Sequence, residues 1–348
     1  MATWSRRDVI KGLACGAAAG TVGGSCAPVV CGATGAQGAE AWPAVDVLVC
    51  GGGPAGVAAA MMAASQGRKT LLVERYGRLG GMAVQAMVGP LMGSVQSERV
   101  DAILERLGGR RVNYEFIDLK YAGLVEEAGG AILLHAWGCQ PLCEASRVRG
   151  ARLLTKQGLI DVPATVTIDA TGDGDIAFGA GAEFDQGRGA GPNWPADGLM
   201  QPMTIMFRVA GVNSAESMDA KGGRGRYRFP DGRTWNELSK DANARGELPP
   251  NVGMVRIYSS LRDDERVINA TQVNQVDGLK VRDLTQAELD GRRQVPVVLE
   301  FLRKYAPGFQ KAYVSGMPAV IGVRETRRIR GVEQMTVEDM LEGRKSDR

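Results

Sequence analysis

The chain has 348 residues, of which 44% are hydrophobic and 23% charged, a composition typical of a globular protein with about two domains. Its net charge of +3 is too small to indicate nucleic acid as the main partner. The single histidine, His135, excludes zinc sites and hydrolytic mechanisms that need two histidines, and the sequence predicts no metal site.

The first residues have the pattern of a bacterial twin-arginine export signal. Arg6 and Arg7 precede a weakly apolar run rich in glycine and alanine, and residues 39–41 form an A-x-A cleavage site. We predict a signal peptide over residues 1–41 that engages the twin-arginine export machinery, and a mature protein that is periplasmic or extracytoplasmic. The alternatives are a low-complexity tail or a membrane anchor, and the anchor is disfavoured because the run is only mildly apolar.

A phosphate-binding turn follows. Residues 45–50 are a short apolar run typical of a buried parallel strand, and residues 55–66 predict a helix rich in alanine and methionine. The turn between them reads G-x-G-x-x-G, and residues 69–74 predict a second strand that ends in an acid. This order is the fingerprint of a β–α–β unit that binds a dinucleotide.

Each part of this unit has a physical task. Gly51 permits the tight turn, Gly53 lets the backbone approach a pyrophosphate, and Gly56 lets the helix pack closely on the strand. The N–H groups at the helix start receive the phosphate charge, and Glu74 accepts hydrogen bonds from the ribose hydroxyls. The predicted contacts in this unit are Gly51, Gly53, Pro54, Ala55, Gly56 and Glu74.

Two further segments favour FAD over NAD as the dinucleotide. The chain after Glu74 continues through Arg75 to Gly80, Gly81 and Met82, and paired glycines here fit backbone that passes close to the flavin side of FAD. A strand at residues 166–168 then runs into A-T-G-D. This loop, with Gly172 and Asp173, is predicted as the second FAD contact, Asp173 acting through its backbone or a bridged ion.

Four segments resemble the FAD-dependent oxidoreductase family that shares its flavin domain with the heterodisulfide reductase A subunit. They are GGGPAGVAAA, LVERYGRLGGMA, IDATGDGDIAFGAGAEF and IGVRETRR. A more distant resemblance is to the fumarate reductase flavoproteins. The resemblance covers the chain from Val45 onward and implies a non-covalent FAD. It also implies an α/β fold with a Rossmann-like two-part FAD-binding domain, a β-meander and an inserted α+β substrate domain, but no particular substrate.

Several elements are predicted between the motifs. Apolar residues at helical spacing predict a helix over residues 114–129, and residues 131–137 predict a strand in which His135 is packed. Residues 147–164 predict a β-meander, and Trp137 to Cys143 are expected to line the adenine end. Farther along, we expect a loop over residues 184–196 and a strand over residues 199–212 that opens a second domain.

The IGVRETRR segment suggests a site for negative charge. Arg324 and Arg328 are predicted to face the flavin or an anionic substrate, and Glu325 to orient either arginine. Because a cation near the flavin stabilises its reduced, anionic form, we predict a catalytic role for Arg324. The alternative is that the alternating charges form a solvated surface.

Three cysteines remain beyond the predicted leader. The spacing of Cys139 and Cys143 allows a disulfide or a redox pair in an oxidising compartment. The alternative is that these two cysteines, like Cys50, stay as unpaired thiols. No cysteine run typical of an iron–sulfur cluster is present in the sequence.

The predicted organisation has three parts after the leader. They are a FAD-binding domain over residues 42–198, a substrate domain over residues 199–318, and a return to the FAD domain over residues 319–348. In the resembled family the IGVRETRR segment is followed by a further flavin contact and a closing helix. The resemblance therefore implies that the chain is truncated at the C-terminus and holds FAD weakly.

We predict an exported FAD-dependent oxidoreductase that transfers a hydride or two electrons between a small organic substrate and an unidentified acceptor. One alternative is a flavin electron-transfer subunit of a heterodisulfide reductase-like complex. The other is a truncated nucleotide-binding fragment without turnover.

Overall fold

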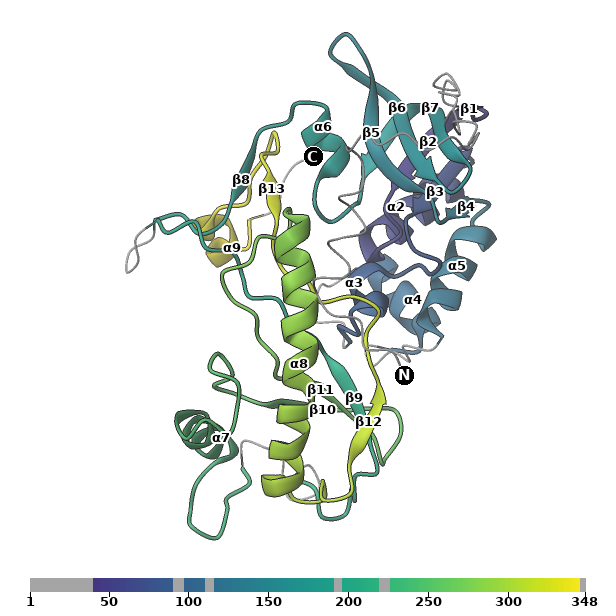
Figure 1. Cartoon of the computed structure of the whole chain (residues 1–348). Helices are drawn as coiled ribbons and strands as arrows, with labels where there is room; N and C mark the ends of the chain where they lie inside the picture. Colours follow the sequence, from purple (N-terminus) through teal and green to yellow (C-terminus); the bar gives the residue numbers. More distant parts are fainter. Residues whose placement is uncertain (1–39, 90–96, 110–115, 191–195, 219–225, 345–348) are drawn as a thin grey trace, which may run out of the picture. The chain divides into compact units, whose positions relative to one another are not determined.

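The computed structural model describes residues 40–89, 97–109, 116–190, 196–218 and 226–344, all within one unit of the chain (Figure 1). The predicted twin-arginine leader lies outside the described residues, apart from Glu40 and Ala41. These two residues form β1 (Glu40–Ala41), which pairs with a later strand of the first sheet.

Parallel strands form the centre of the first sheet. They run side by side in the order β4 (Ala131–Leu134), β3 (Thr70–Glu74), β2 (Val45–Cys50) and β7 (Gly158–Asp169). Every residue of β3 is buried, as expected of a parallel strand that is covered on both faces. The predicted Rossmann-like α/β fold is therefore confirmed.

Helices cover one face of this sheet and antiparallel strands cover the other. Val57 and Ala60 of α2 (Pro54–Ser65) pack with residues of α5 (Ile117–Glu127) against β2 and β3. The helix predicted over residues 114–129 thus appears as α5, and α4 (Glu98–Leu107) precedes it. The opposite face packs on the meander of β5 (Trp137–Glu144), β6 (Arg147–Thr155) and β7.

The long strand β7 belongs to both parts of the sheet. Residues from Gly158 to Pro163 pair with β6, and residues from Ala164 to Asp169 pair with β2. The register places Asp169 opposite Cys50, so that β2 and β7 end at the same edge. The two loops that the sequence assigns to one dinucleotide therefore begin next to each other.

A second, antiparallel sheet is built mainly from later residues. Its strands lie in the order β10 (Arg256–Ser259), β11 (Arg266–Asn269), β9 (Phe207–Ala210) and β12 (Tyr313–Gly316). Of the strand predicted over residues 199–212, only β9 forms, and Met203 and Thr204 contribute isolated bridges. This sheet shares one hydrophobic core with α7 (Trp235–Ala244) and α8 (Val281–Tyr305). The domain limits at residues 198 and 318 stay predictions.

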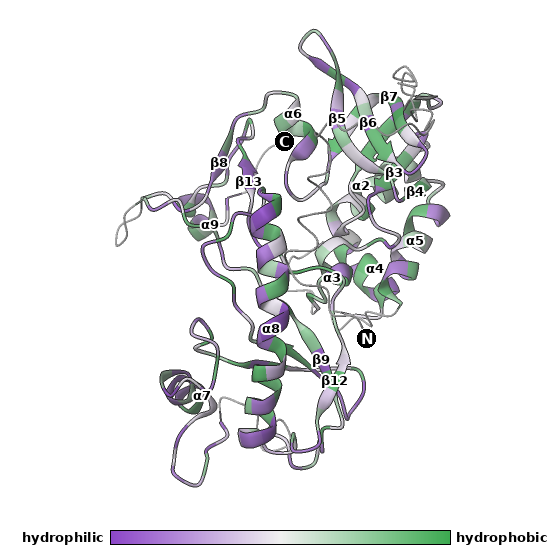
Figure 2. Ribbon diagram, viewed as in Figure 1, coloured by the Kyte–Doolittle hydropathy of each residue, from purple (hydrophilic) through white to green (hydrophobic). Residues whose placement is uncertain are grey.

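The long helix α8 packs one side on the second sheet. Bands of hydrophobic and hydrophilic residues alternate along it (Figure 2). Its buried residues include Ala287, Gly291, Val295, Val298 and Leu302, at the three- and four-residue intervals of an amphipathic helix. Neither α8 nor another helix in the described ranges combines the length and apolar character needed to cross a membrane.

Two short strands connect segments that are distant in sequence. β8 (Phe184–Gln186) pairs antiparallel with β13 (Arg327–Ile329), in a region where the sequence predicts only a loop. The loop prediction is wrong for residues 184–186, because the partner strand lies more than 140 residues away and leaves no local signal. Short helices complete the described chain: α3 (Gly81–Gln85), α6 (Asp175–Gly179) and α9 (Val337–Glu342).

Replacing Trp235 by alanine should destabilise the second core. Trp235 is fully buried, its indole nitrogen donates to the Val255 carbonyl at 2.7 Å, and its ring lies 5.3 Å from that of Phe301. We expect Trp235→Ala to cost about 3–5 kcal/mol of unfolding free energy in urea titrations, as large-to-small core substitutions do. Leu289→Ala, at an exposed position on α8, should cost less than about 0.5 kcal/mol. Similar losses in both variants would contradict this packing.

Candidate functional site

The glycine-rich turn after β2 is shaped by close backbone contacts. Gly51 has a φ of 106°, and a Cβ atom on it would lie 2.2 Å from the Ala170 carbonyl oxygen. A Cβ atom on Gly56 would lie 1.8 Å from the Gly51 carbonyl oxygen. Both positions therefore require glycine, Gly51 for the turn and Gly56 for the approach of α2 to it.

Gly53 differs from these two glycines because the space beside it is open. A Cβ atom there would have only the Gly81 Cα atom near it, at 3.9 Å. Gly53 is the N-cap of α2, and Pro54 follows it in the first turn. The backbone N–H groups at the start of α2 thus face a free space of the kind that a pyrophosphate fills.

This space is part of a cavity of about 230 Å³ at the edge where β2, β3 and β7 end. Its lining includes these predicted residues: Gly51, Gly53, Pro54, Ala55, Glu74, Arg75, Gly81, Met82 and Gly172. The lining also contains Ala170 and Thr171 of the predicted A-T-G-D loop, and three residues that the sequence analysis does not single out: Val73, Tyr76 and Ala136. Of the remaining predicted cofactor residues, Gly56 and Gly80 lie against the backbone of the turn, and Asp173 does not line the cavity.

Glu74 connects the turn to the end of β3. Its buried carboxylate accepts hydrogen bonds from the backbone N–H of Gly52 at 2.7 Å and of Tyr76 at 2.9 Å. Each carboxylate oxygen keeps lone-pair capacity for a second donor. The side chain therefore holds the turn in shape and can still accept the hydrogen bonds from ribose hydroxyls that the sequence predicts.

Aromatic side chains border one end of this cavity. The Arg75 guanidinium lies 4.8 Å from the ring centre of Tyr76 and 5.6 Å from that of Trp137. Trp137 and Gly138 both line the cavity, within the segment expected at the adenine end. The prediction that His135 is packed in a strand is wrong: β4 ends at Leu134, and His135 is exposed with a left-handed φ of 55°.

The paired glycines after β3 lie directly on the turn. The backbone N–H of Gly80 donates to the Gly52 carbonyl at 2.7 Å, and Gly80 has a φ of 111°. A Cβ atom on Gly81 would lie 3.0 Å from the Gly53 Cα atom. A side chain at Gly81 would push the two segments apart, and one at Gly80 would clash with the Val84 side chain, 2.3 Å from its Cβ atom.

The loop after β7 is organised by Asp169. Its carboxylate accepts hydrogen bonds from the backbone N–H and hydroxyl of Thr171, at 3.0 and 2.7 Å, and from the Ala177 N–H at 2.8 Å. These bonds hold Thr171 and Gly172 against the cavity. The Asp173 side chain instead accepts a hydrogen bond from the Thr326 hydroxyl at 2.8 Å, and burial raises the pKa of Asp173 above its usual range.

The return segment, defined as residues 320–330, reaches this loop through Arg327. Its guanidinium donates to the Asp173 carbonyl and to the Asp175 carboxylate, both at 2.9 Å, and lies 4.2 Å from the ring centre of Phe178. The Arg327 side chain is only 13% exposed. The sequence analysis did not single out this arginine. A signal was available, because successive side chains of a strand point to opposite faces, so Arg327 and Arg328 cannot face the same way.

The two arginines that were predicted to face the flavin are both exposed. Arg324 donates to the Thr204 hydroxyl at 3.3 Å and does not line the cavity of 230 Å³. Arg328 pairs with Glu325 and donates to the Gly187 carbonyl at 2.7 Å. Glu325 thus orients Arg328, one of the two options that the sequence left open.

The cysteines of the described chain have free thiols. Burial, followed by the charge of Asp169, raises the pKa of Cys50 to about 12. Burial also raises the pKa of Cys139, whereas Cys143 is exposed. No group of three or more His, Cys, Asp or Glu side chains suited to a metal ion occurs among the described residues.

Alkylation should therefore distinguish these cysteines. At pH 8 a thiol with a pKa of about 12 is ionised in roughly one molecule in ten thousand, so iodoacetamide should leave Cys50 unmodified in the folded protein. Cys143 should react readily, and Cys50 should react only after unfolding in guanidinium. Peptide mapping by mass spectrometry measures each site. Rapid native labelling of Cys50 would show that the end of β2 opens.

The fold is that of a Rossmann-type dinucleotide-binding protein, and two of its loops line one cavity. The model of the family described as FAD dependent oxidoreductase matches residues 46–348, and the chain belongs to this family. Its cofactor is FAD. The open space beside Gly53 and the convergence of both loops on one cavity fit this group. Comparison with curated proteins gives no match.

Several solved structures are similar in fold. A geranylgeranyl bacteriochlorophyll reductase-like protein from Thermoplasma acidophilum has 16% identity and a TM-score of 0.45, over 82% of this chain and 66% of the other. A myxobacterial FAD-dependent chondrochloren halogenase has 16% identity and a TM-score of 0.49, over 82% and 64%. A p-nitrophenol 4-monooxygenase from Pseudomonas putida has 11% identity and a TM-score of 0.49, over 85% and 71%. The chain thus spans slightly less than two thirds of the first two proteins.

Proposed function

We propose that this protein is an exported FAD-dependent oxidoreductase that moves a hydride or two electrons between a small organic substrate and a separate acceptor. The observation that carries the proposal is the single cavity onto which the Gly51–Gly53 turn and the Thr171–Gly172 loop converge. FAD supplies the redox chemistry when bound, and the protein supplies binding, orientation and charge.

Separate groups of residues are proposed to hold the parts of FAD. The pyrophosphate is assigned to the N–H groups at the start of α2, beside Gly53, and the ribose hydroxyls to Glu74. The adenine is assigned to the end bordered by Trp137. These assignments follow from the open space at Gly53 and from the buried carboxylate at the cavity wall.

Arg324 is proposed to act on the ring end of the cofactor. It belongs to the same segment as Thr326 and Arg327, which both contact the loop after β7. An exposed guanidinium held by the Thr204 hydroxyl would stabilise negative charge that develops nearby. The proposed substrate part is residues 199–318, which supply the second sheet, and residues 319–348 return to the cofactor part.

A visible absorption spectrum of the purified protein tests the proposed cofactor binding. Two bands near roughly 375 and 450 nm are expected of an oxidised bound flavin. The longer band should bleach when an electron-donating substrate is added without oxygen and return when an acceptor is added. A folded, colourless protein to which added FAD does not bind would contradict the proposal. Bleaching that occurs only with a partner protein would favour the electron-transfer subunit instead.

Export is tested separately from catalysis. The proposal predicts that the protein recovered outside the cytoplasm begins at Trp42, because residues 39–41 form the cleavage site. Replacing Arg6 and Arg7 by lysine keeps the charge but removes the twin-arginine pattern, and should leave the protein in the cytoplasm. Unchanged export of this variant would exclude the twin-arginine route.

A further inference from the structure

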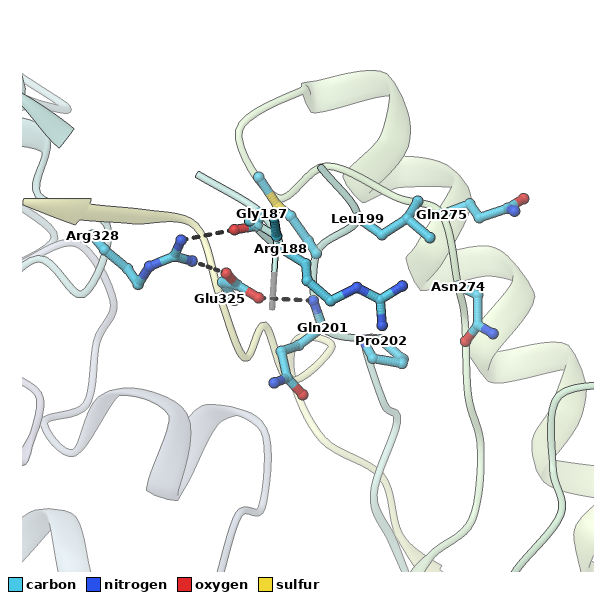
Figure 3. A pocket seen from close by; sticks show the side chains of 12 residues that line it. Gly187, Arg188, Leu199, Gln201, Pro202, Asn274, Gln275, Glu325 and Arg328 are labelled. Atoms are coloured by element: carbon cyan, nitrogen blue, oxygen red, sulfur yellow. Dashed lines mark hydrogen bonds and ion pairs between the residues drawn. The ribbon is translucent and has the colours of Figure 1, made fainter. Parts of the chain in front are cut away.

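A second cavity, of about 650 Å³, lies beside the return segment (Figure 3). Roughly 300–1,000 Å³ is the size of sites for small organic molecules. Its described lining comes from three stretches of chain: residues 187–190 with 199–202, residues 274 and 275, and the return segment at Glu325 and Arg328. None of these residues lines the cofactor cavity.

Hydrogen bonds between these stretches fix the walls of the cavity. The Arg328 guanidinium donates to the Gly187 carbonyl at 2.7 Å, and the backbone N–H of Gln201 donates to Glu325 at 3.0 Å (Figure 3). Met203 and Val273 exchange two backbone hydrogen bonds, at 2.9 and 3.0 Å, and so place residues 274 and 275 opposite residues 199–202. These bonds therefore hold the three stretches together around the cavity.

Carboxylates neutralise the charge of the arginines on the described lining, and one of them, Asp197, lies just outside the lining. Its charged residues are Arg188, Glu325 and Arg328. Arg188 pairs with Asp197 through two of its nitrogens, and Arg328 pairs with Glu325. Because two carboxylates offset two guanidinium groups, a carboxylate or phosphate ligand meets no net positive charge here.

The remaining polar groups suit a neutral ligand that is rich in oxygen. Arg188 and Arg328 are half-exposed, and each guanidinium has N–H donors beyond those that bind Asp197, Glu325 and the Gly187 carbonyl. Asn274 and Gln275 are exposed and contribute amide groups that both donate and accept. Gln275 has a left-handed φ of 58°, a conformation that is uncommon outside glycine and concentrates at functional sites.

The second cavity is also connected to the cofactor loop. Thr326 and Arg327 lie between the lining residues Glu325 and Arg328 in the sequence, and both contact Asp173. Gly172, the neighbour of Asp173, lines the cofactor cavity. A molecule held at Glu325 and Arg328 therefore contacts the same short segment that holds the loop after β7.

We propose that this cavity binds the non-reacting part of the substrate, and that the substrate is a neutral, hydroxyl-rich molecule of the oligosaccharide class. That the bound molecule is the substrate rests on the proposed function. Its physical basis is the balanced charge, the amide and guanidinium donors, and the size of the cavity.

Calorimetric titration of the full-length, flavin-loaded protein tests the proposal. The probes are maltose, cellobiose and lactose, each compared with its aldobionic acid, which has similar size and one negative charge. We expect at least one neutral disaccharide to bind with a Kd on the order of 1 mM, about tenfold more tightly than its acid. Stronger binding of the acids, or no binding of any neutral probe, would overturn the proposal.

Variants locate the binding and separate it from catalysis. Asn274→Ala with Gln275→Ala should weaken binding of the neutral probe at least about fivefold, while the flavin spectrum stays unchanged. Gln286→Ala removes an exposed amide on α8 outside the cavity and should have no effect. Binding that is insensitive to the double substitution would overturn the assignment. A probe that binds here without bleaching the flavin supports the cavity but contradicts the proposed transfer from that probe.

Discussion

Gly53→Asp is expected to yield a folded protein that no longer retains FAD. The φ of −68° at Gly53 is accessible to any residue, and the nearest atom to a new Cβ is 3.9 Å away. Aspartate is also a favourable helix N-cap, so α2 should form normally. The new carboxylate would occupy the space assigned to the pyrophosphate. Repulsion between charges about 4 Å apart near a protein surface is worth about 4 kcal/mol, or about a thousandfold in affinity.

The measurement is the flavin content of purified protein, together with thermal unfolding followed by circular dichroism. Gly253→Asp is the matched control, because no atom lies within 4 Å of a Cβ at this position and it is outside both cavities. This variant should retain FAD like the parent. Stoichiometric FAD on folded Gly53→Asp protein would place the pyrophosphate elsewhere.

The cofactor turn could be predicted from the sequence because its determinants are local. The strand, the glycines and the helix follow one another within residues 45–66, and Glu74 completes β3 a few residues later. The structure requires glycine at position 51 for the tight turn and at position 56 for the close packing of α2, as the spacing of the motif predicts. The loop after β7 was recognised for a similar reason, since an apolar strand leads directly into A-T-G-D.

Contacts between distant segments could not be predicted in the same way. The pairing of β8 with β13 joins Phe184 to Ile329, and neither three-residue strand has a pattern of its own. The orientation of the return segment depends on this pairing. The sequence analysis favours Arg324 and Arg328, whereas the register of β13 brings Arg327 to the loop after β7. The second cavity was missed because its walls come from three separate stretches.

Arg327→Ala is expected to weaken both the fold of the return segment and the retention of FAD. Arg327 joins the return segment to the loop after β7 through the Asp173 carbonyl, the Asp175 carboxylate and the Phe178 ring. Removing one partner of a largely buried ion pair costs about 3 kcal/mol, because the other charge is left without its partner. The loop that carries Gly172 would lose a fixed position, and we expect FAD to bind about a hundredfold more weakly.

Urea unfolding and the Kd for FAD, from quenching of flavin fluorescence, measure the two effects. Arg327→Lys keeps the charge but loses the planar fork, so it should fall between the parent and the alanine variant. Arg330→Ala removes a neighbouring arginine whose contacts with Glu183 and Asp185 are exposed, and should cost less than about 1 kcal/mol.

A double-mutant cycle with Asp175→Asn isolates the ion pair from the other contacts of Arg327. If the pair acts as the structure indicates, the double variant should be less destabilised than the sum of the single variants, because Arg327→Ala then leaves no unpaired carboxylate at Asp175. The remaining loss in FAD affinity would belong to the contacts with the Asp173 carbonyl and Phe178. Equal FAD affinity in Arg327→Ala and Arg330→Ala would show that the return segment does not position the cofactor loop.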